Sequence, residues 1–81
     1  MMTPSKHTTP RATRRSQVMV LLIDHGPMSI TEISRELQLS RSYTGTIVRE
    51  LESDGNVYQA YTDRLPNGVN RPIYAIREEL N

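Results

Sequence analysis

Residues 29–40 read SITEISRELQLS, and residues 41–55 continue as RSYTGTIVRELESDG. The first stretch opens with a capping box, because the Ser29 hydroxyl can accept a backbone N–H while the Glu32 side chain reaches back. Apolar residues then recur at helical spacing and share one face. These residues are Ile30, Ile33 and Leu37. The sequence therefore predicts a short amphipathic helix that begins directly after Ser29.

A second helix is predicted over residues 41–54. Ser40 is a good N-cap, and Gly55 stands where a left-handed C-cap would end the helix. The buried face of this helix is expected to carry Ile47, Val48 and Leu51. Two capped helices joined by so short a turn form a helix-turn-helix, which lays its second helix in the major groove of DNA. Double-stranded DNA is therefore the first partner that the sequence suggests.

Length and composition exclude several other classes of protein. The chain has 81 residues, which suit one small domain, and no cysteine, so disulfides and cysteine-based zinc fingers are excluded. His7 and His25 lack metal-ligand spacing, and we expect no metal, cofactor or small-molecule ligand. No nucleophile–base pair or phosphate-binding glycine loop is present, so we expect no enzyme. The longest apolar run, Val18 to Ile23, is too short for a membrane span or a signal peptide, and we expect a cytoplasmic protein.

Charge is unevenly distributed along the chain. Residues 1–15 contain four basic residues and no acidic one, whereas residues 16–55 contain three arginines and six acidic residues. A basic arm thus precedes a mildly acidic helical body, although the formal net charge is only +1. A DNA-binding surface must keep the acidic residues away from phosphates. Most of them fall on the first helix of the motif or at the far end of the second.

The remainder of the chain divides around the helix-turn-helix. We expect residues 1–12 to form a disordered basic arm, residues 13–76 to form the folded domain, and residues 77–81 to be a frayed tail. A first helix should run from about Thr13 to His25, because a Gly-Pro pair follows and stops it.

Two β-prone runs follow the second helix of the motif, at residues 57–62 and 71–76. They flank residues 63–70, where Asn67-Gly68 marks a turn, so the pattern predicts a hairpin with a long tip. Pro72 cannot donate a ladder hydrogen bond, which suits a strand start or an edge position. Side chains expected to alternate inward onto the core are Tyr74 and Ile76.

This order of elements resembles the winged helix-turn-helix proteins of bacteria, archaea and their phages. The likeness covers roughly residues 14–76 and is carried by residues 29–42, 48–57 and 74–76. It implies an α+β, mainly α fold of three helices plus a two-stranded β-hairpin wing. It also implies sequence-specific binding of double-stranded DNA by a small transcriptional regulator, either a repressor or an excisionase-like factor.

Three positions depart from the family pattern, one of them being Asn56, where an apolar residue is common. Gln38 lies in the turn, where the family often has glycine; in a left-handed backbone, a residue other than glycine costs about 1 kcal/mol. Thr44 replaces the usual aliphatic residue on the buried face, and its hydroxyl needs a backbone acceptor.

The resemblance places the outward stripe of the second helix in the major groove and the wing, residues 63–71, on phosphates or in the minor groove. Arg41 and Arg49 are then guanine or phosphate contacts, and Asn side chains of the wing can donate to base acceptors. Each residue has a plainer alternative, as part of a solvated polar face or loop. The full set expected to contact DNA is Arg14, Arg15, Ser40, Arg41, Ser42, Tyr43, Gly45, Thr46, Arg49, Arg64, Asn67, Asn70 and Arg71.

Two further questions stay open at this point. A winged helix can also serve as a protein–protein interaction module without specific DNA binding. The first helix has more apolar side chains than one face can hold, at Val20, Leu21 and Ile23, which favours a homodimer through this helix. Cover by the C-terminal tail, through Leu80, is the alternative.

Overall fold

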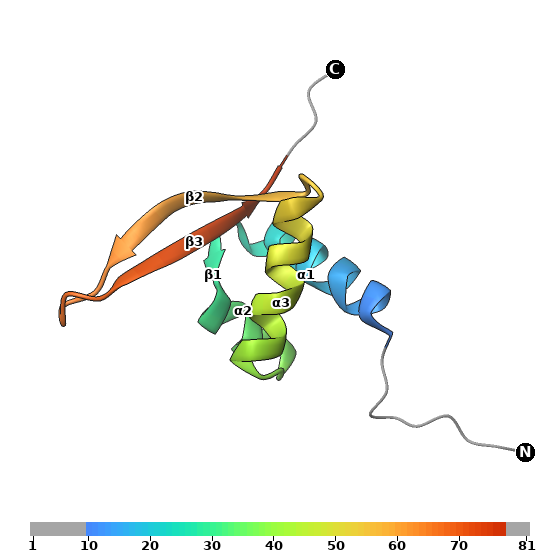
Figure 1. Cartoon of the computed structure of the whole chain (residues 1–81), viewed down its shortest axis with the longest axis horizontal. Helices are drawn as coiled ribbons and strands as arrows, with labels where there is room; N and C mark the ends of the chain where they lie inside the picture. Colours follow the sequence, from blue (N-terminus) through green and yellow to red (C-terminus); the bar gives the residue numbers. More distant parts are fainter. Residues whose placement is uncertain (1–9, 78–81) are drawn as a thin grey trace, which may run out of the picture.

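The computed structural model describes residues 10–77 of the chain. Helices gather at one end, and a long hairpin projects beyond them (Figure 1). This arrangement confirms the predicted α+β fold with three helices and a wing. In chain order the elements are α1 (Arg11–His25), β1 (Met28–Ser29), α2 (Ile30–Leu37), α3 (Arg41–Ser53), β2 (Val57–Arg64) and β3 (Asn70–Ile76).

Helix α1 begins earlier than its sequence pattern predicts. Arg11 and Ala12 are helical, so their assignment to a disordered arm is wrong. Pro10 precedes them with φ −56°, and its carbonyl accepts the Arg14 N–H at 3.1 Å. Proline suits this place because a helix N-terminus has no partner for the missing N–H. The rest of the predicted arm (residues 1–9) and of the predicted tail (residues 78–81, with Leu80) lies outside the described residues.

Helix α2 begins with the predicted capping box. The Ser29 Oγ accepts the Glu32 N–H at 3.1 Å, and the Ser29 N–H donates to the Glu32 carboxylate at 2.8 Å. The helix ends at Gln38, whose backbone is left-handed with φ 58°. A glutamine therefore occupies a left-handed position that glycine would adopt without strain, as expected from the departure at residue 38.

Helix α3 is capped at both ends. At its start the Ser40 Oγ accepts the Tyr43 N–H at 3.1 Å. Its end is a Schellman motif, because Asn56 N–H donates to Leu51 O while Gly55, with φ 83°, donates to Glu52 O. These bonds satisfy carbonyls that would otherwise be unpaired at the helix end.

The buried polar group of α3 is also accounted for. Thr44 is fully buried, and its hydroxyl donates to the Ser40 carbonyl at 2.8 Å. The backbone acceptor expected from the sequence is therefore present within the helix itself.

The sheet differs from the predicted two-stranded wing. A third strand, β1, pairs with β3 through Met28–Tyr74 and Ser29–Ile73, so the order is β1-β3-β2. A two-residue strand has too short a pattern to be read from sequence. Pro72 consequently lies in the central strand rather than at its start, but beyond the two residues that β1 covers.

The hairpin tip is shorter than predicted. Asp63 pairs with Arg71, and Arg64 pairs with Asn70, so these residues extend the ladder. The tip is only residues 65–69. It closes through a Gly68 N–H bond to Leu65 O at 2.9 Å, and the ladder is extended by an Arg71–Asp63 ion pair of 3.1 Å across the strands.

The core lies where α1, α2 and α3 meet the base of the hairpin. The apolar faces predicted for α2 and α3 point inward, and Tyr74 is buried as expected, with Ile76 partly buried against it. Ile73 and Ala75 are buried too, so this part of β3 is covered on both faces. The buried cluster consists of Val18, Leu22, Met28, Ile33, Ile47, Val48, Leu51, Val57 and Tyr74.

Helix α1 leaves part of its apolar surface exposed. Val20 is 55% exposed and Ile23 is 63% exposed, whereas Leu21 is partly buried against the core. Within residues 10–77, no helix is both long and apolar enough to cross a membrane.

Candidate nucleic-acid interface

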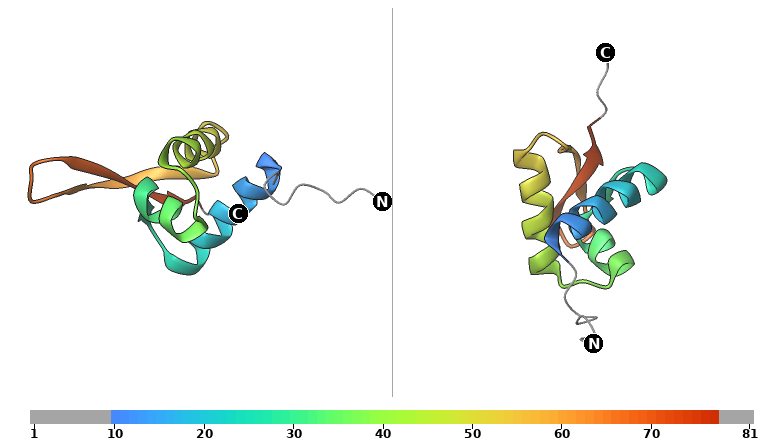
Figure 2. Two further views of the ribbon diagram at one scale, coloured as in Figure 1. Left: turned by 90° about the horizontal axis from the view of Figure 1, so that it is seen from below. Right: turned by 90° about the vertical axis from the view of Figure 1, so that its right-hand side faces the viewer.

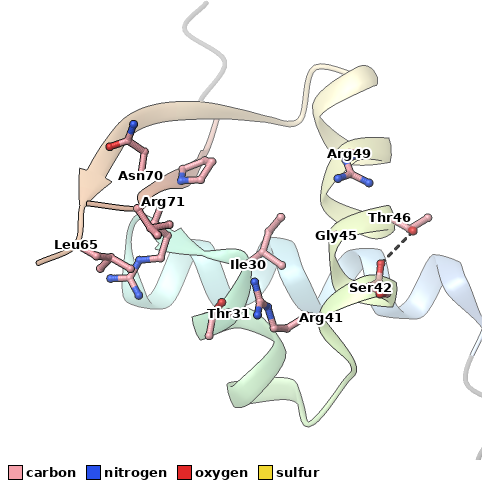
Figure 3. A pocket seen from close by; sticks show the side chains of 12 residues that line it. Ile30, Thr31, Arg41, Ser42, Gly45, Thr46, Arg49, Leu65, Asn70 and Arg71 are labelled. Carbon is pink, nitrogen blue, oxygen red and sulfur yellow. Dashed lines mark hydrogen bonds between the residues drawn. The ribbon is translucent and has the colours of Figure 1, made fainter. Parts of the chain in front are cut away.

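A concave groove lies between the wing, the start of α2 and one side of α3 (Figure 3). Its walls come from residues far apart in sequence, because the wing supplies one part of the lining and helices α2 and α3 supply the rest. Residues that line it are Ile30, Thr31, Arg41, Ser42, Gly45, Thr46, Arg49, Leu65, Val69, Asn70, Arg71 and Pro72.

The groove is strongly cationic. Arg41 and Arg49 line it from α3, Arg71 lines it from the wing, and none of its lining residues is acidic. Arg41 and Arg49 are exposed, while Arg71 is half-buried and paired with Asp63. A positive concave surface attracts polyanions electrostatically, and here it stands out because the helical region as a whole has more acids than bases.

Five of the predicted α3 residues line this groove, and two of them, Ser42 and Thr46, carry hydroxyl groups. Ser42 is exposed and Thr46 is half-buried, and the Thr46 hydroxyl donates to Ser42 O at 3.1 Å. The oxygen of Thr46 remains able to accept a hydrogen bond. Arginine and hydroxyl side chains supply the donors and acceptors that base edges and phosphates require.

Gly45 is buried rather than exposed. An added Cβ would meet the Ile30 Cδ1 at 3.8 Å, which is ordinary van der Waals contact. The plainer alternative for Gly45, a place on a solvated face, is therefore wrong, because α2 covers this residue. Gly45 nevertheless lines the groove. Because glycine has no side chain, the floor of the groove lies close to the α3 backbone at this position.

Tyr43 and Ser40 are engaged elsewhere. Tyr43 is half-buried and packs against the core cluster, with the Arg11 guanidinium 5.8 Å from its ring centroid. The Ser40 hydroxyl caps α3. Neither residue lines the groove, and each has a structural task within the fold.

The basic first turns of α1 lie on the side of α3 away from the wing (Figures 1 and 2). Arg15 forms an ion pair with Asp54, and Arg11 pairs with Glu50 at 2.8 Å. Arg14 donates to Gln17 at 2.9 Å. The groove therefore does not include Arg14 or Arg15.

These ion pairs join two helix ends with unfavourable charges. Arginines at the start of α1 oppose the positive end of its dipole, and acids at the end of α3 oppose the negative end of its own. Because the two ends pack together, each supplies the counter-charge that the other lacks. The ion pairs between α1 and α3 thus offset the unfavourable placement of these charges.

The wing brings predicted and unpredicted residues to the groove. Asn70 and Arg71 line it, whereas Arg64 and Asn67 are exposed on the wing without lining it. The Asn67 side chain accepts the Val69 N–H at 3.0 Å, which stabilises the tip. Sequence reasoning missed Leu65 and Val69 because apolar residues beside a turn resemble strand ends. It missed Ile30 and Thr31 because the groove forms only when α2 packs beside the wing.

Tyr74 belongs to the core cluster and is influenced by the charges of Arg49 and Glu52. Burial raises its pKa above the ordinary value, the negative charge of Glu52 raises it further, and the positive charge of Arg49 lowers it. The tyrosine is therefore neutral at physiological pH and serves as part of the core.

Solved structures with the same fold include DNA-associated proteins. The chain is similar to the Zalpha domain of PKZ from Carassius auratus, solved in complex with Z-DNA, with TM-score 0.67 and 13% identity over 85% of this chain and 100% of that one. It is similar to the apo-Zalpha domain of zebrafish PKZ, with TM-score 0.69 and 20% identity over 86% and 100% of the two chains. It is also similar to the reduced transcriptional regulator YodB from B. subtilis, with TM-score 0.60 and 24% identity over 96% and 76%.

These similarities establish the winged-helix fold. Comparison with curated proteins gave no significant match. The model of the MarR family matches residues 14–59, from α1 into β2, which is more than half of the chain. On that match, and with the winged-helix architecture described above, the protein belongs to the MarR family.

Proposed function

We propose that the protein is a small transcriptional regulator that binds double-stranded DNA sequence-specifically. Helix α3 enters the major groove, and the wing lies on phosphates or in the minor groove. The protein acts by occupying an operator as a repressor, or by organising a nucleoprotein complex as an excisionase-like factor does.

One observation carries this proposal. The groove between α3 and the wing is lined by three arginines and no acidic residue, whereas two acids at the end of α3, Glu50 and Asp54, pair on the opposite side with Arg11 and Arg15. The fold thus separates its charges, so that every charged side chain lining the groove is a cation. Charge separation of this kind raises the association rate with polyanions.

Within the groove, we assign base reading to α3. Arg49 and Thr46 lie on its exposed side, Arg41 and Ser42 at its N-terminal end (Figure 3). Arginine can donate two hydrogen bonds to guanine, and the hydroxyls can bond either bases or phosphates.

A selection from a randomised duplex pool, followed by competition gel shifts at physiological salt, tests this assignment. Arg49→Ala and Thr46→Ala should each weaken binding to the selected duplex by about 1–3 kcal/mol and leave binding to random duplexes nearly unchanged. Arg35→Ala is the matched control, because Arg35 is an exposed arginine on α2 outside the groove. Equal losses for Arg35→Ala and Arg49→Ala would contradict base reading by α3.

Phosphate contacts are assigned to the wing and the N-terminal arm. Arg64→Ala and Arg71→Ala should lower affinity for every duplex and reduce the salt slope by roughly 0.9 per lost contact. Removal of residues 1–9 deletes Lys6 without touching α1 and should have the same kind of effect. An unchanged slope after truncation would identify the arm as a solvated tail.

The main alternative is a protein–protein interaction module. If selection enriches no sequence, and binding is equally weak for all duplexes, this alternative replaces the proposal. A duplex held in the Z form is a useful comparison in the same titrations, because one structural neighbour was solved with Z-DNA.

We also propose that two copies act together on DNA through α1. Val20 and Ile23 are more than half exposed on this helix, and a lone recognition helix reads few base pairs. Two copies would cover half-sites about one helical turn apart. Val20→Glu should abolish cooperative binding and leave the fold intact; sedimentation of the complex with one copy per minimal site would contradict pairing.

A further inference from the structure

The tip of the wing combines a fixed backbone with apolar side chains. Leu65 N–H donates to Val69 O at 2.9 Å, Gly68 N–H donates to Leu65 O at 2.9 Å, and Asn67 accepts the Val69 N–H. Gly68 has φ 88°, a left-handed conformation that glycine adopts without strain. The side chains of Leu65, Pro66 and Val69, called the apolar tip below, are therefore held on a rigid turn.

The folded domain does not need these apolar groups. Leu65 and Val69 are absent from the core cluster and from the residues packed against it, Pro66 is exposed, and Val69 is 53% exposed. A single exposed apolar residue is common, but here two exposed ones, Pro66 and Val69, and the half-buried Leu65 belong to one five-residue turn. This turn ends the hairpin that projects from the helices (Figure 1). Such a cluster on a pre-organised turn is suited to burial against a partner.

The surroundings of the apolar tip define the chemistry of that partner. Arg64 and Arg71 lie on the wing beside it, and Arg41 and Arg49 lie across the groove (Figure 3). The one acidic residue of the wing, Asp63, is paired with Arg71. A partner must therefore be an anion that also presents apolar edges, as the sugars and stacked bases of a DNA minor groove do.

We infer that the apolar tip is a wedge that enters the minor groove beside the α3 site and partly opens one base step. Proteins that bend DNA insert leucine or proline in this way, and arginines on either side hold the phosphates. The energy of opening depends on sequence, because pyrimidine–purine steps unstack most easily. The wing would then favour DNA with an easily unstacked base step at this position, without hydrogen bonds to the bases of that step. This inference rests on the proposed function, since it requires that the protein bind duplex DNA.

The test compares two selections from one randomised duplex pool, with the wild-type protein and with the Leu65→Ser, Val69→Ser double variant. Pro66 is kept because it pre-sets the turn. At the position next to the α3 site, the wild type should enrich TA or CA steps at least about fivefold, and the variant should show no step preference. The base preferences under α3 should be the same for both.

Energy transfer between dyes at the two ends of the selected duplex gives a second readout. Wild type should shorten the end-to-end distance, whereas the double variant should not. Val69→Thr, which keeps the branched shape of valine, should reduce the bend in part. Tyr61→Ser is the control, because Tyr61 is 55% exposed on β2 but does not line the groove; it should bend DNA as the wild type does.

The outcomes separate this inference from the proposed function. If the wild type enriches no sequence at all, the proposed function fails, and the wedge fails with it. If sequences are enriched but the two selections show the same step frequencies, and the duplex bends equally with both proteins, the wedge is refuted while the proposed function stands. If the double variant changes only self-association in sedimentation, a second copy covers the tip, and the inference is likewise overturned.

Discussion

Exchanging the two charges of the Arg11–Glu50 pair should make the protein more stable than the wild type. In the native chain Arg11 is the first residue of α1 and Glu50 lies in the last turn of α3, so each opposes the dipole of its own helix. The native Arg11 and Glu50 side chains lie 2.8 Å apart. The variant Arg11→Glu, Glu50→Arg places opposite charges at the same two positions. Both residues would then favour their own helix ends.

The magnitude follows from the exposure of the pair. A charge near a helix end contributes about 0.3–1 kcal/mol, and the exchange reverses its sign at two ends. The side chains are 51% and 34% exposed, so solvent screening leaves the low end of this range, about 1 kcal/mol in total. Loss of the Arg11–Tyr43 cation–π contact removes roughly 0.5 kcal/mol. A net gain of about 0.5 kcal/mol should raise the midpoint of thermal unfolding by roughly 2–4 °C.

Thermal unfolding followed by circular dichroism at low salt measures this gain, and high salt should reduce it. The control exchange is Asp63→Arg, Arg71→Asp, since this cross-strand pair has similar exposures of 47% and 32% but no helix dipole. It should leave the midpoint nearly unchanged. A midpoint for the Arg11/Glu50 exchange at or below that of the wild type would refute the dipole argument.

Four further outcomes are expected. Ile47→Ala should cost about 2–5 kcal/mol and unfold much of the protein at 37 °C, because Ile47 is fully buried; a urea titration measures this. Gln38→Gly should stabilise the protein by up to about 1 kcal/mol, because it relieves the left-handed backbone; a lower unfolding midpoint would contradict the assigned turn. Thr44→Val should change the free energy of unfolding by less than about 1 kcal/mol, because the Ser40 carbonyl still accepts the backbone N–H of residue 44 at 3.0 Å after the hydroxyl is lost. Thr44→Ala should be clearly destabilising, because it also leaves a cavity in the core. Because the pKa of Tyr74 is raised in the folded state, its contribution to stability should be constant below pH 10 and be lost as the pH rises above it. Tyr74→Phe should remove this part of the fall in alkaline unfolding experiments.

The helices, their caps and the outward face of α3 could be predicted from the sequence because their signals are local. The Ser29–Glu32 capping box, the Ser40 cap and the Gly55 C-cap each involve residues within a few positions of one another. The inward faces of α2 and α3 follow from apolar residues at helical spacing. The outward arginines Arg41 and Arg49 follow from the same geometry, since they occupy the opposite side.

Tertiary structure decided what depends on distant partners. Arg11 and Arg15 pair with acids 39 residues away, so their part in joining α1 to α3 has no local signal. Strand β1 exists only because β3 lies beside Met28 and Ser29. The groove itself has the same origin: Ile30, Arg49 and Arg71 belong to three elements and share a surface only after α2, α3 and the wing have packed. Helix caps and apolar periodicity depend on residues close together in the sequence, so they can be recognised from it. The position of one element against another depends on the burial of a common core, which involves residues far apart in the chain.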